Sequence, residues 1–258
     1  MLREFRTDLH VHTCLSPCGD LSMSPRKIVA EVLRQGINII AVTDHNSAAN
    51  IGAVTKAAEG APVVVLAGME ICTREEAHVL AIFDNETPAL KLQSVVYNAL
   101  SGVNNPDVFG LQVMANELDE VEGFEERLLI GATDLSVEDV VRAVHKLGGL
   151  AIAAHIDRES YSVIGQLGFI PRAVTFDALE VSELTSDKDA RTRFSDYMRY
   201  VFVRNSDAHT IDRIGAQTTR FLLEAPTASE IGKALRCEDG RKLVSVETRI
   251  DNRQSIVR

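Results

Sequence analysis

Short apolar segments recur along the chain, and segments with helical periodicity lie between them. The apolar segments are rich in β-branched residues and almost continuously hydrophobic, which is typical of strands buried on both faces. They occupy residues 37–42, 63–67, 78–83, 150–154, 178–181, 200–203 and 221–223. Residues 3–11 alternate more between polar and apolar side chains, and we predict that they form the first strand.

The segments between these strands carry helix signals at their ends. Ser24 and Pro25 precede one of them and Gly36 follows it, the usual order of an N-cap, a first-turn proline and a terminal glycine. Thr227 begins another, and Glu230 follows it at the spacing of a capping box. Because strands and helices alternate, the sequence predicts a parallel α/β barrel or a doubly wound sheet.

Residues 84–131 interrupt this alternation. They contain Pro88, Gly102 and Gly110, and acidic side chains gather between Glu117 and Glu126. We predict a small, mostly helical insertion that covers one rim of the fold. The rest of the chain has no internal repeat and no flexible linker, so residues 1–258 are expected to form a single domain.

Composition narrows the class of protein. Hydrophobic residues make up 45% and charged residues 25% of the 258 residues, which is the balance of an ordinary globular protein. No apolar segment is long enough for a membrane span, and the charged N-terminal segment does not resemble a secretory signal. Four cysteines without regular spacing favour a reducing compartment. We therefore expect a cytoplasmic protein without a membrane partner, and the oligomeric state stays open.

The charge balance is acidic. There are 37 acidic against 27 basic residues, which gives a formal net charge of −10. A protein that binds the nucleic-acid backbone needs a basic face, and the bases of residues 84–131 are only Lys91 and Arg127. We therefore expect no long nucleic acid as a partner. A small anionic substrate would have to be attracted by bound metal ions.

Six of the seven histidines lie near the ends of predicted strands. They are His10, His12, His45, His78, His155 and His209, whereas His145 lies within a predicted helix. In an α/β barrel the carboxyl ends of the strands form one rim, and active sites are built there. One histidine at a strand end is usually a hydrogen-bonded side chain, but six on one rim indicate a metal site.

Two of the motifs repeat a spacing of two residues. His10 and His12 end the first strand, and Asp207 and His209 follow a later one. Residues two apart on a strand point the same way, so both members of a pair can reach one ion. Glu70 ends another strand, and its two carboxylate oxygens can each serve a different ion.

Six segments also resemble the motifs of one enzyme family, in order and in spacing. They are DLHVHT, AVTDHN, LAGMEI, HVLAIF, AIAAHIDR and RNSDAHT, between residues 8 and 210. In these motifs the chain resembles the polymerase and histidinol phosphatase (PHP) family of metal-dependent phosphoesterases. The resemblance implies a distorted seven-stranded (β/α) barrel with two or three divalent ions, zinc, manganese or iron, at the strand carboxyl ends.

Position by position, the resemblance implies three groups of metal ligands. The first metal would be held by His10, His12, Glu70 and Asp207. The second would share Glu70 and add His78 and His155. The third would take His45, His209 and a residue of the loop after the first strand, where Asp20 is the match and Cys18 the alternative.

The resemblance also implies the reaction. A metal-activated hydroxide would hydrolyse the phosphate ester of a small phosphorylated metabolite or nucleotide. Arg158 would bind the substrate phosphate through its planar guanidinium, and a surface salt bridge is its alternative role. His209, His45 or a metal-bound water would protonate the leaving group, and the sequence does not choose among them.

Two other functions stay open on the sequence alone. A metal-dependent amidohydrolase would also begin with a His-x-His pair, but such enzymes commonly bridge their metals with a lysine at a strand end. This chain has Gly68, Met69 and Glu70 at that place. A non-catalytic PHP module is the other alternative, although such modules tend to lose their ligands.

Overall fold

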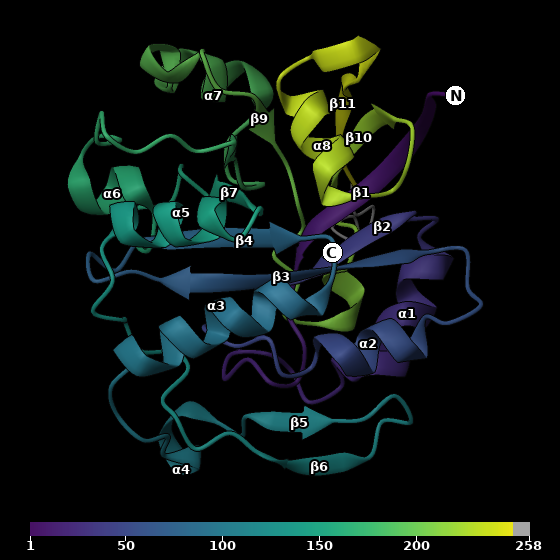
Figure 1. Ribbon diagram of the computed structural model, residues 1–258, viewed down its shortest axis with the longest axis vertical. Coiled ribbons are helices and arrows are strands. Elements are labelled where there is room, and N and C mark those ends of the chain that lie inside the picture. Colours follow the sequence, from purple (N-terminus) through teal and green to yellow (C-terminus); the bar gives the residue numbers. More distant parts are fainter. Residues whose placement is uncertain (250–258) are drawn as a thin grey trace, which may run out of the picture.

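One large sheet organises the computed structural model, which describes residues 1–249. Its nine strands are hydrogen-bonded in the order β11-β10-β1-β2-β3-β4-β7-β8-β9 (Figure 1). Their bounds are β1 Arg3–Val11, β2 Ile39–Val42, β3 Val64–Cys72, β4 His78–Phe83, β7 Leu150–Ala153, β8 Ala178–Glu180, β9 Phe202–Val203, β10 Gln217–Leu223 and β11 Lys242–Thr248. The sheet is barrel-like and nearly closed. The α/β barrel class predicted from the sequence is therefore confirmed, with nine strands in the sheet instead of seven.

The strands do not all run the same way. β1, β2 and β3 are parallel, as are β7, β8 and β9, but β4 is antiparallel to both of its neighbours. Residues 73–77 join β3 to β4, and so short a link cannot hold the crossover that parallel strands require. The first residue of β4, His78, pairs with Cys72 at the end of β3. The reversed strand therefore presents its amino end at the rim where its parallel neighbours end.

Direct contacts between β1 and the segment after β9 bring the barrel close to closure. The His12 N–H donates to the Ala208 carbonyl at 3.0 Å, and the Ala208 N–H donates to the His10 carbonyl at 3.3 Å. The Leu9 N–H donates to Asn205 Oδ1 at 2.8 Å. The strand that carries the His-x-His pair is thus held against the segment that carries Asp207.

Helices cover the sheet. Their bounds are α1 Pro25–Arg34, α2 Ile51–Ala57, α3 Glu86–Ala99, α4 Pro106–Phe109, α5 Val137–Lys146, α6 Val163–Leu167, α7 Asp187–Arg193 and α8 Ala228–Leu235, with 3₁₀ turns at Ser195–Tyr197, Ile211–Arg213 and Glu238–Gly240. The predicted cap of α8 is present, since Thr227 Oγ1 accepts from the Glu230 N–H at 3.1 Å. Along β2, Ile40 and Val42 join one apolar cluster while Ile39 and Ala41 join another. Burial on both faces explains why this strand is continuously apolar.

Residues 84–131 differ from the predicted, mostly helical insertion. Helix α3 packs against β3 and β4, so it belongs to the helical layer of the barrel. Beyond it lie α4 and a two-stranded antiparallel sheet, β5 Val113–Ala115 and β6 Val121–Phe124, away from the main sheet (Figure 1). The sequence signal for β6 is weak because its side chains are mostly exposed and no apolar segment marks it.

Within residues 1–249, no helix combines the length and the apolar character that a membrane crossing requires.

Candidate metal centre

A single carboxylate, Glu70 at the end of β3, lies at the centre of the histidine cluster. It is almost fully buried, with 1% of its surface exposed. Its oxygens face ring nitrogens of five histidines: Oε1 lies 2.8 Å from His78, 3.1 Å from His155 and 3.4 Å from His10, and Oε2 lies 3.0 Å from His45 and 3.3 Å from His12. Oε1 therefore lies near three of the rings and Oε2 lies near the other two.

Asp207 completes the cluster from the opposite edge of the barrel. Its Oδ1 lies 3.2 Å from His10 Nε2 and 3.3 Å from His12 Nε2. The two Nε2 atoms are themselves only 3.2 Å apart. One N–H···N hydrogen bond between these two nitrogens would leave the facing oxygens of Glu70 and Asp207 without that donor, so the convergence of both rings on two carboxylates favours a bound cation.

The ligand atoms form three groups in which a metal ion would fit. The first group is His10, His12, Glu70 and Asp207, the set that the resemblance implies for the first metal. The second contains His45, Glu70 and His78, with His155 beside the same carboxylate. The third contains His12, His45 and His209.

Asp20, the predicted third-metal ligand from the loop after β1, lies outside these groups. Its side chain is exposed, and Oδ1 accepts from the Ser22 N–H at 2.7 Å. The loop turns between Ser16 and Gly19, and only the Asp20 backbone N–H reaches the carbonyl of His209. Cys18, the alternative, is exposed and lines the cavity beside the cluster.

Unusual backbone conformations occur at two residues of the cluster and at Asn46, which follows His45. Asn46, His155 and Asp207 have φ values of 51°, 28° and 50°, which non-glycine residues rarely adopt. Such strain persists only where the surrounding structure enforces it, and it is concentrated at functional sites. Around Asp207 the constraint includes Asp8, which accepts from the N–H groups of Ser206 at 2.9 Å and Gly215 at 3.0 Å.

Burial and the neighbouring charges shift the pKa values of the cluster in both directions. Burial opposes the ionisation of Glu70, yet the histidines around it hold its pKa well below the ordinary value. Burial also disfavours a charge on His10, but Glu180, Asp207 and Glu70 raise its pKa well above the ordinary value. Burial lowers the pKa of His209 to about 4. A neutral imidazole is a metal ligand rather than a proton donor at pH 7.

Two buried carboxylate oxygens in the cluster have the unused acceptor capacity that a metal ion would fill. Glu70 Oε2 and Asp207 Oδ1 have no hydrogen-bond partner among residues 1–249. An unpartnered buried acceptor costs about 1–3 kcal/mol or more, and a divalent cation would satisfy both oxygens. The donor set of imidazole nitrogens and carboxylate oxygens suits zinc, manganese and iron.

No role was assigned from the sequence to two acids that hold the ligands in place, although one of them, Asp44, lies in the motif AVTDHN. Glu180, at the end of β8, lies 3.0 Å from His10 Nδ1 and accepts from the His155 N–H at 3.0 Å. Asp44 Oδ1 accepts from Ser16 Oγ at 2.7 Å, and that hydroxyl lies 2.8 Å from His12 Nδ1. Each acid follows an apolar strand, and an acid at such a strand end is the signal that could have found them.

Two cavities meet at this centre. One of about 450 Å³ is lined by ligands of the cluster together with Cys18, Ile130, Arg158, Glu159, Ser160 and Tyr161. Another of about 250 Å³ lies beside Glu180, Glu183 and Arg213. Arg158 lines both, and its Nη1 lies 2.8 Å from Asp207 Oδ2. The predicted phosphate-binding residue therefore reaches the metal centre.

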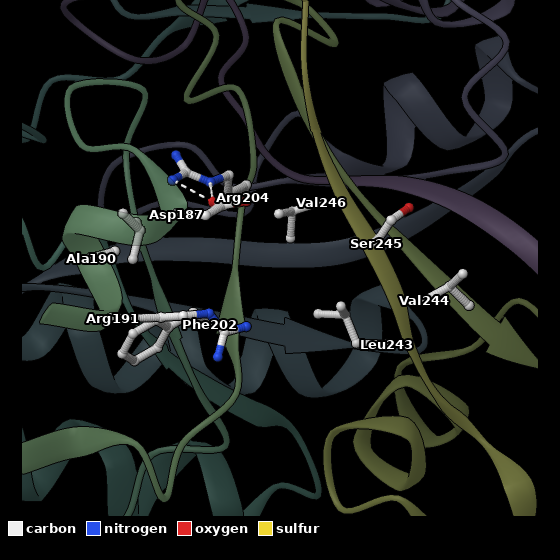
Figure 2. Close-up of a pocket in the computed structure, with 10 residues that line it drawn as sticks. Asp187, Ala190, Arg191, Phe202, Arg204, Leu243, Val244, Ser245 and Val246 are labelled. Atoms are coloured by element: carbon white, nitrogen blue, oxygen red, sulfur yellow. Dashed lines mark hydrogen bonds and ion pairs between the residues drawn. The ribbon is translucent and has the colours of Figure 1, made fainter. Parts of the chain in front are cut away.

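A third pocket, of about 320 Å³, lies between α7, β9 and β11 (Figure 2). Arg204 lines it and pairs with Asp187 at 2.7 Å. None of the residues that line it belongs to the metal cluster, so it has no part in the site described above.

Comparison with known proteins places this centre in a family. A sequence model of the PHP domain matches residues 8–159. The uncharacterized protein YqxK of Bacillus subtilis is 30% identical over 109 residues, which is 40% of this chain and 28% of YqxK. A 5'-3' exoribonuclease of Haemophilus influenzae is 32% identical over 87 residues, which is 32% of this chain and 31% of that enzyme. The chain thus matches less than a third of the length of either relative.

Solved structures share the fold at low sequence identity. Endonuclease Q of Pyrococcus furiosus superposes with a TM-score of 0.72 at 20% identity, over 95% of this chain and 58% of that protein. A two-domain protein of Bacteroides vulgatus, described as containing a predicted PHP-like metal-dependent phosphoesterase, gives a TM-score of 0.58 at 16% identity, over 96% and 66% of the two chains.

One of these structures corrects the expectation that long nucleic acid is excluded. Endonuclease Q was also solved with a 27-mer duplex whose abasic lesion lies at the active site, with a TM-score of 0.72 at 19% identity, over 95% of this chain and 59% of that protein. The expectation is wrong because net charge averages over the whole protein surface. The electrostatic potential at a binding site depends instead on the metal ions and the few basic side chains close to it. The fold, the histidine–carboxylate cluster and a family match over more than half of the sequence lead to one conclusion: the chain belongs to the PHP domain family.

Proposed function

We propose that this chain is a metal-dependent phosphoesterase that hydrolyses the phosphate ester of a small phosphorylated molecule or a nucleotide unit. The observation that supports this most is the position of Glu70, whose two oxygens face five histidine rings within 3.4 Å. One carboxylate between clustered imidazoles is suited to bridge two metal ions. The family match supports the same class of reaction.

The residues present fit the metals that such a reaction needs. The three ligand groups described above would hold two or three ions, and zinc, manganese and iron all suit their donor atoms. When bound, such ions lower the pKa of water and neutralise charge on a phosphoryl group. Glu180 and Asp44 would keep the imidazoles of His10 and His12 in the orientation that ligation requires.

Arg158 is suited to hold the phosphate. Its side chain is 38% exposed, lines both cavities and contacts Asp207 with one nitrogen. The other guanidinium nitrogen can donate to a phosphate oxygen, since the planar fork presents several N–H groups. A proton for the leaving group is less readily supplied by His209, because burial lowers its pKa to about 4. We therefore favour ligation as the role of His209 and of His45.

The reaction class can be tested on the purified chain. Metal is removed with a chelator and zinc, manganese or iron is returned singly. Hydrolysis is measured as phosphate release from sugar phosphates and nucleoside monophosphates, and as chain cleavage of short oligonucleotides. We expect hydrolysis that requires metal. Hydrolysis of amides or lactones without phosphoester hydrolysis would favour an amidohydrolase. A protein that retains less than one ion per chain and turns over no phosphoester would favour a non-catalytic module.

Arg158→Lys tests the phosphate contact. We expect kcat/KM toward phosphomonoesters to fall about tenfold or more, because one mobile point charge replaces a planar fork. Metal content should stay unchanged, since lysine keeps a positive charge near Asp207. Arg213→Lys is the matched control, because that side chain lines only the smaller cavity. Unchanged kcat/KM in Arg158→Lys would leave Arg158 with its salt bridge to Asp207 alone.

A further inference from the structure

We infer that Tyr161 is a stacking surface for a nucleobase of the substrate and thereby selects nucleotide units over other phosphate esters. This inference rests on the proposed function and names the class of substrate. The observations that carry it are the exposure of the Tyr161 ring, its contact with a ligand of the metal cluster, the strain in its backbone and the chemistry of the cavity that it lines.

The ring of Tyr161 lies directly outside the metal cluster, against one of its histidines. It stacks on the imidazole of His78 with the ring centroids 4.9 Å apart and the planes inclined by 24°. His78 in turn reaches Glu70 at 2.8 Å. Although one face of the tyrosine ring is covered, 47% of the residue's surface is exposed. The ring therefore offers an open flat surface beside the centre where a phosphoryl group would react.

The position of this ring is enforced by the backbone. Tyr161 has φ 59°, an unfavourable value for a bulky residue. Its carbonyl accepts from the His78 N–H at 2.9 Å, and Ser162 Oγ donates to the Arg158 carbonyl at 2.6 Å. Strain that is held in this way, at an exposed aromatic residue beside the metal cluster, is typical of a ligand-contacting position.

The cavity around the ring fits a planar, uncharged group. Ile130 lines the same cavity of about 450 Å³, so apolar side chains come from two separate segments. Glu159 and Ser160 also line it and are exposed. The Glu159 carboxylate would repel a second phosphate but can accept from the amino group of a base. Flat aromatic groups are what a tyrosine face binds best, and nucleobases have both a flat face and donor groups at the edge.

A matched pair of ligands isolates the base. Adenosine 5'-monophosphate and ribose 5-phosphate share the sugar and the phosphate and differ at C1′, where the first carries the base and the second a hydroxyl group. We expect the metal-loaded chain to bind the methylenephosphonate analogue of the first more tightly than that of the second. The difference should be roughly five- to hundredfold, the range that stacking of one base contributes. The same ratio should appear in KM for the two phosphates.

Variants of Tyr161 show whether this ring causes the preference for the base-containing analogue. Tyr161→Gly removes the ring and suits the positive φ, and it should lose the preference while metal content and ribose 5-phosphate binding stay the same. Tyr161→Phe should keep the preference. Phe169→Ala is the control, because Phe169 is 57% exposed and does not line the cavity.

The outcomes separate the inference from the proposed function. Phosphate-ester hydrolysis with equal affinity for both analogues, or an unchanged preference in Tyr161→Gly, overturns the inference and leaves the proposed function intact. Base-dependent binding through Tyr161 without any hydrolysis supports the stacking surface and contradicts the proposed function. Neither binding nor hydrolysis overturns both.

Discussion

Glu70→Gln is expected to lose at least one metal ion per chain and to lose phosphoesterase activity by more than a hundredfold. The carboxylate is the group shared by two of the three ligand groups, and an amide is a neutral and much weaker ligand. Substitution of a residue that only orients a metal ligand lowers metal affinity or activity by about 10–100-fold. Loss of a bridging ligand should lower activity by more than that. Metal analysis of the purified variant and its kcat/KM on the best phosphoester provide the measurement.

Asp20→Asn is the matched control for this change. Asp20 is an acid that the sequence predicted as a ligand, but its exposed carboxylate accepts from the Ser22 N–H instead. We expect this variant to keep its metals and its activity. Normal metal content and turnover in Glu70→Gln would contradict the central role of Glu70, and metal loss in Asp20→Asn would return Asp20 to the ligand set.

Glu180→Gln is expected to weaken metal affinity by about 10–100-fold. The Glu180 carboxylate accepts from Asn205 Nδ2 at 2.8 Å and lies 3.0 Å from His10 Nδ1. A carboxylate holds the His10 proton on Nδ1, which leaves the Nε2 lone pair for the metal. A glutamine amide that donates to Nδ1 would favour the other tautomer, with Nε2 protonated and unable to bind.

The metal dependence of activity distinguishes this effect from loss of a ligand. In Glu180→Gln, activity should return toward the normal value at high metal concentration, whereas Glu70→Gln should not recover. Glu183→Gln is the control, because Glu183 lines the same small cavity but pairs with Arg213 and contacts no ligand. An unchanged metal affinity in Glu180→Gln would reduce the role of Glu180 to its hydrogen bonds with Asn205 and with the His155 N–H.

Sequence reasoning works best here where chemistry repeats at a fixed spacing. The pairs His10–His12 and Asp207–His209 could be placed on one rim because each lies at or just after the end of an apolar strand, although Asp207 and His209 belong to the segment after β9 and not to a strand. Buried strands such as β2 could be found because both faces are apolar. These two regularities define most of the cluster and most of the barrel.

The features that sequence reasoning missed depend on contacts between distant segments or on the course of a loop. In the sequence, Glu180 is only an acid at the end of an apolar segment. Its contact with His10, 170 positions away, is visible only in the fold. Asp20 has the right residue type in the right loop, but the turn between Ser16 and Gly19 directs its carboxylate elsewhere. The reversed direction of β4 follows from the length of a link and not from hydrophobic pattern.

The near-closure of the barrel has a consequence for the order of folding. Glu70 and His78 lie on the β3–β4 hairpin, so their contact requires the closure of only a short loop. His10 and Asp207 lie almost two hundred positions apart and meet only when the segment after β9 reaches β1. An ion held by both would link β1 to the segment after β9 and offset the entropy of closing that long loop. Chelation should then loosen the junction of β1 and β9 before it loosens the β3–β4 hairpin.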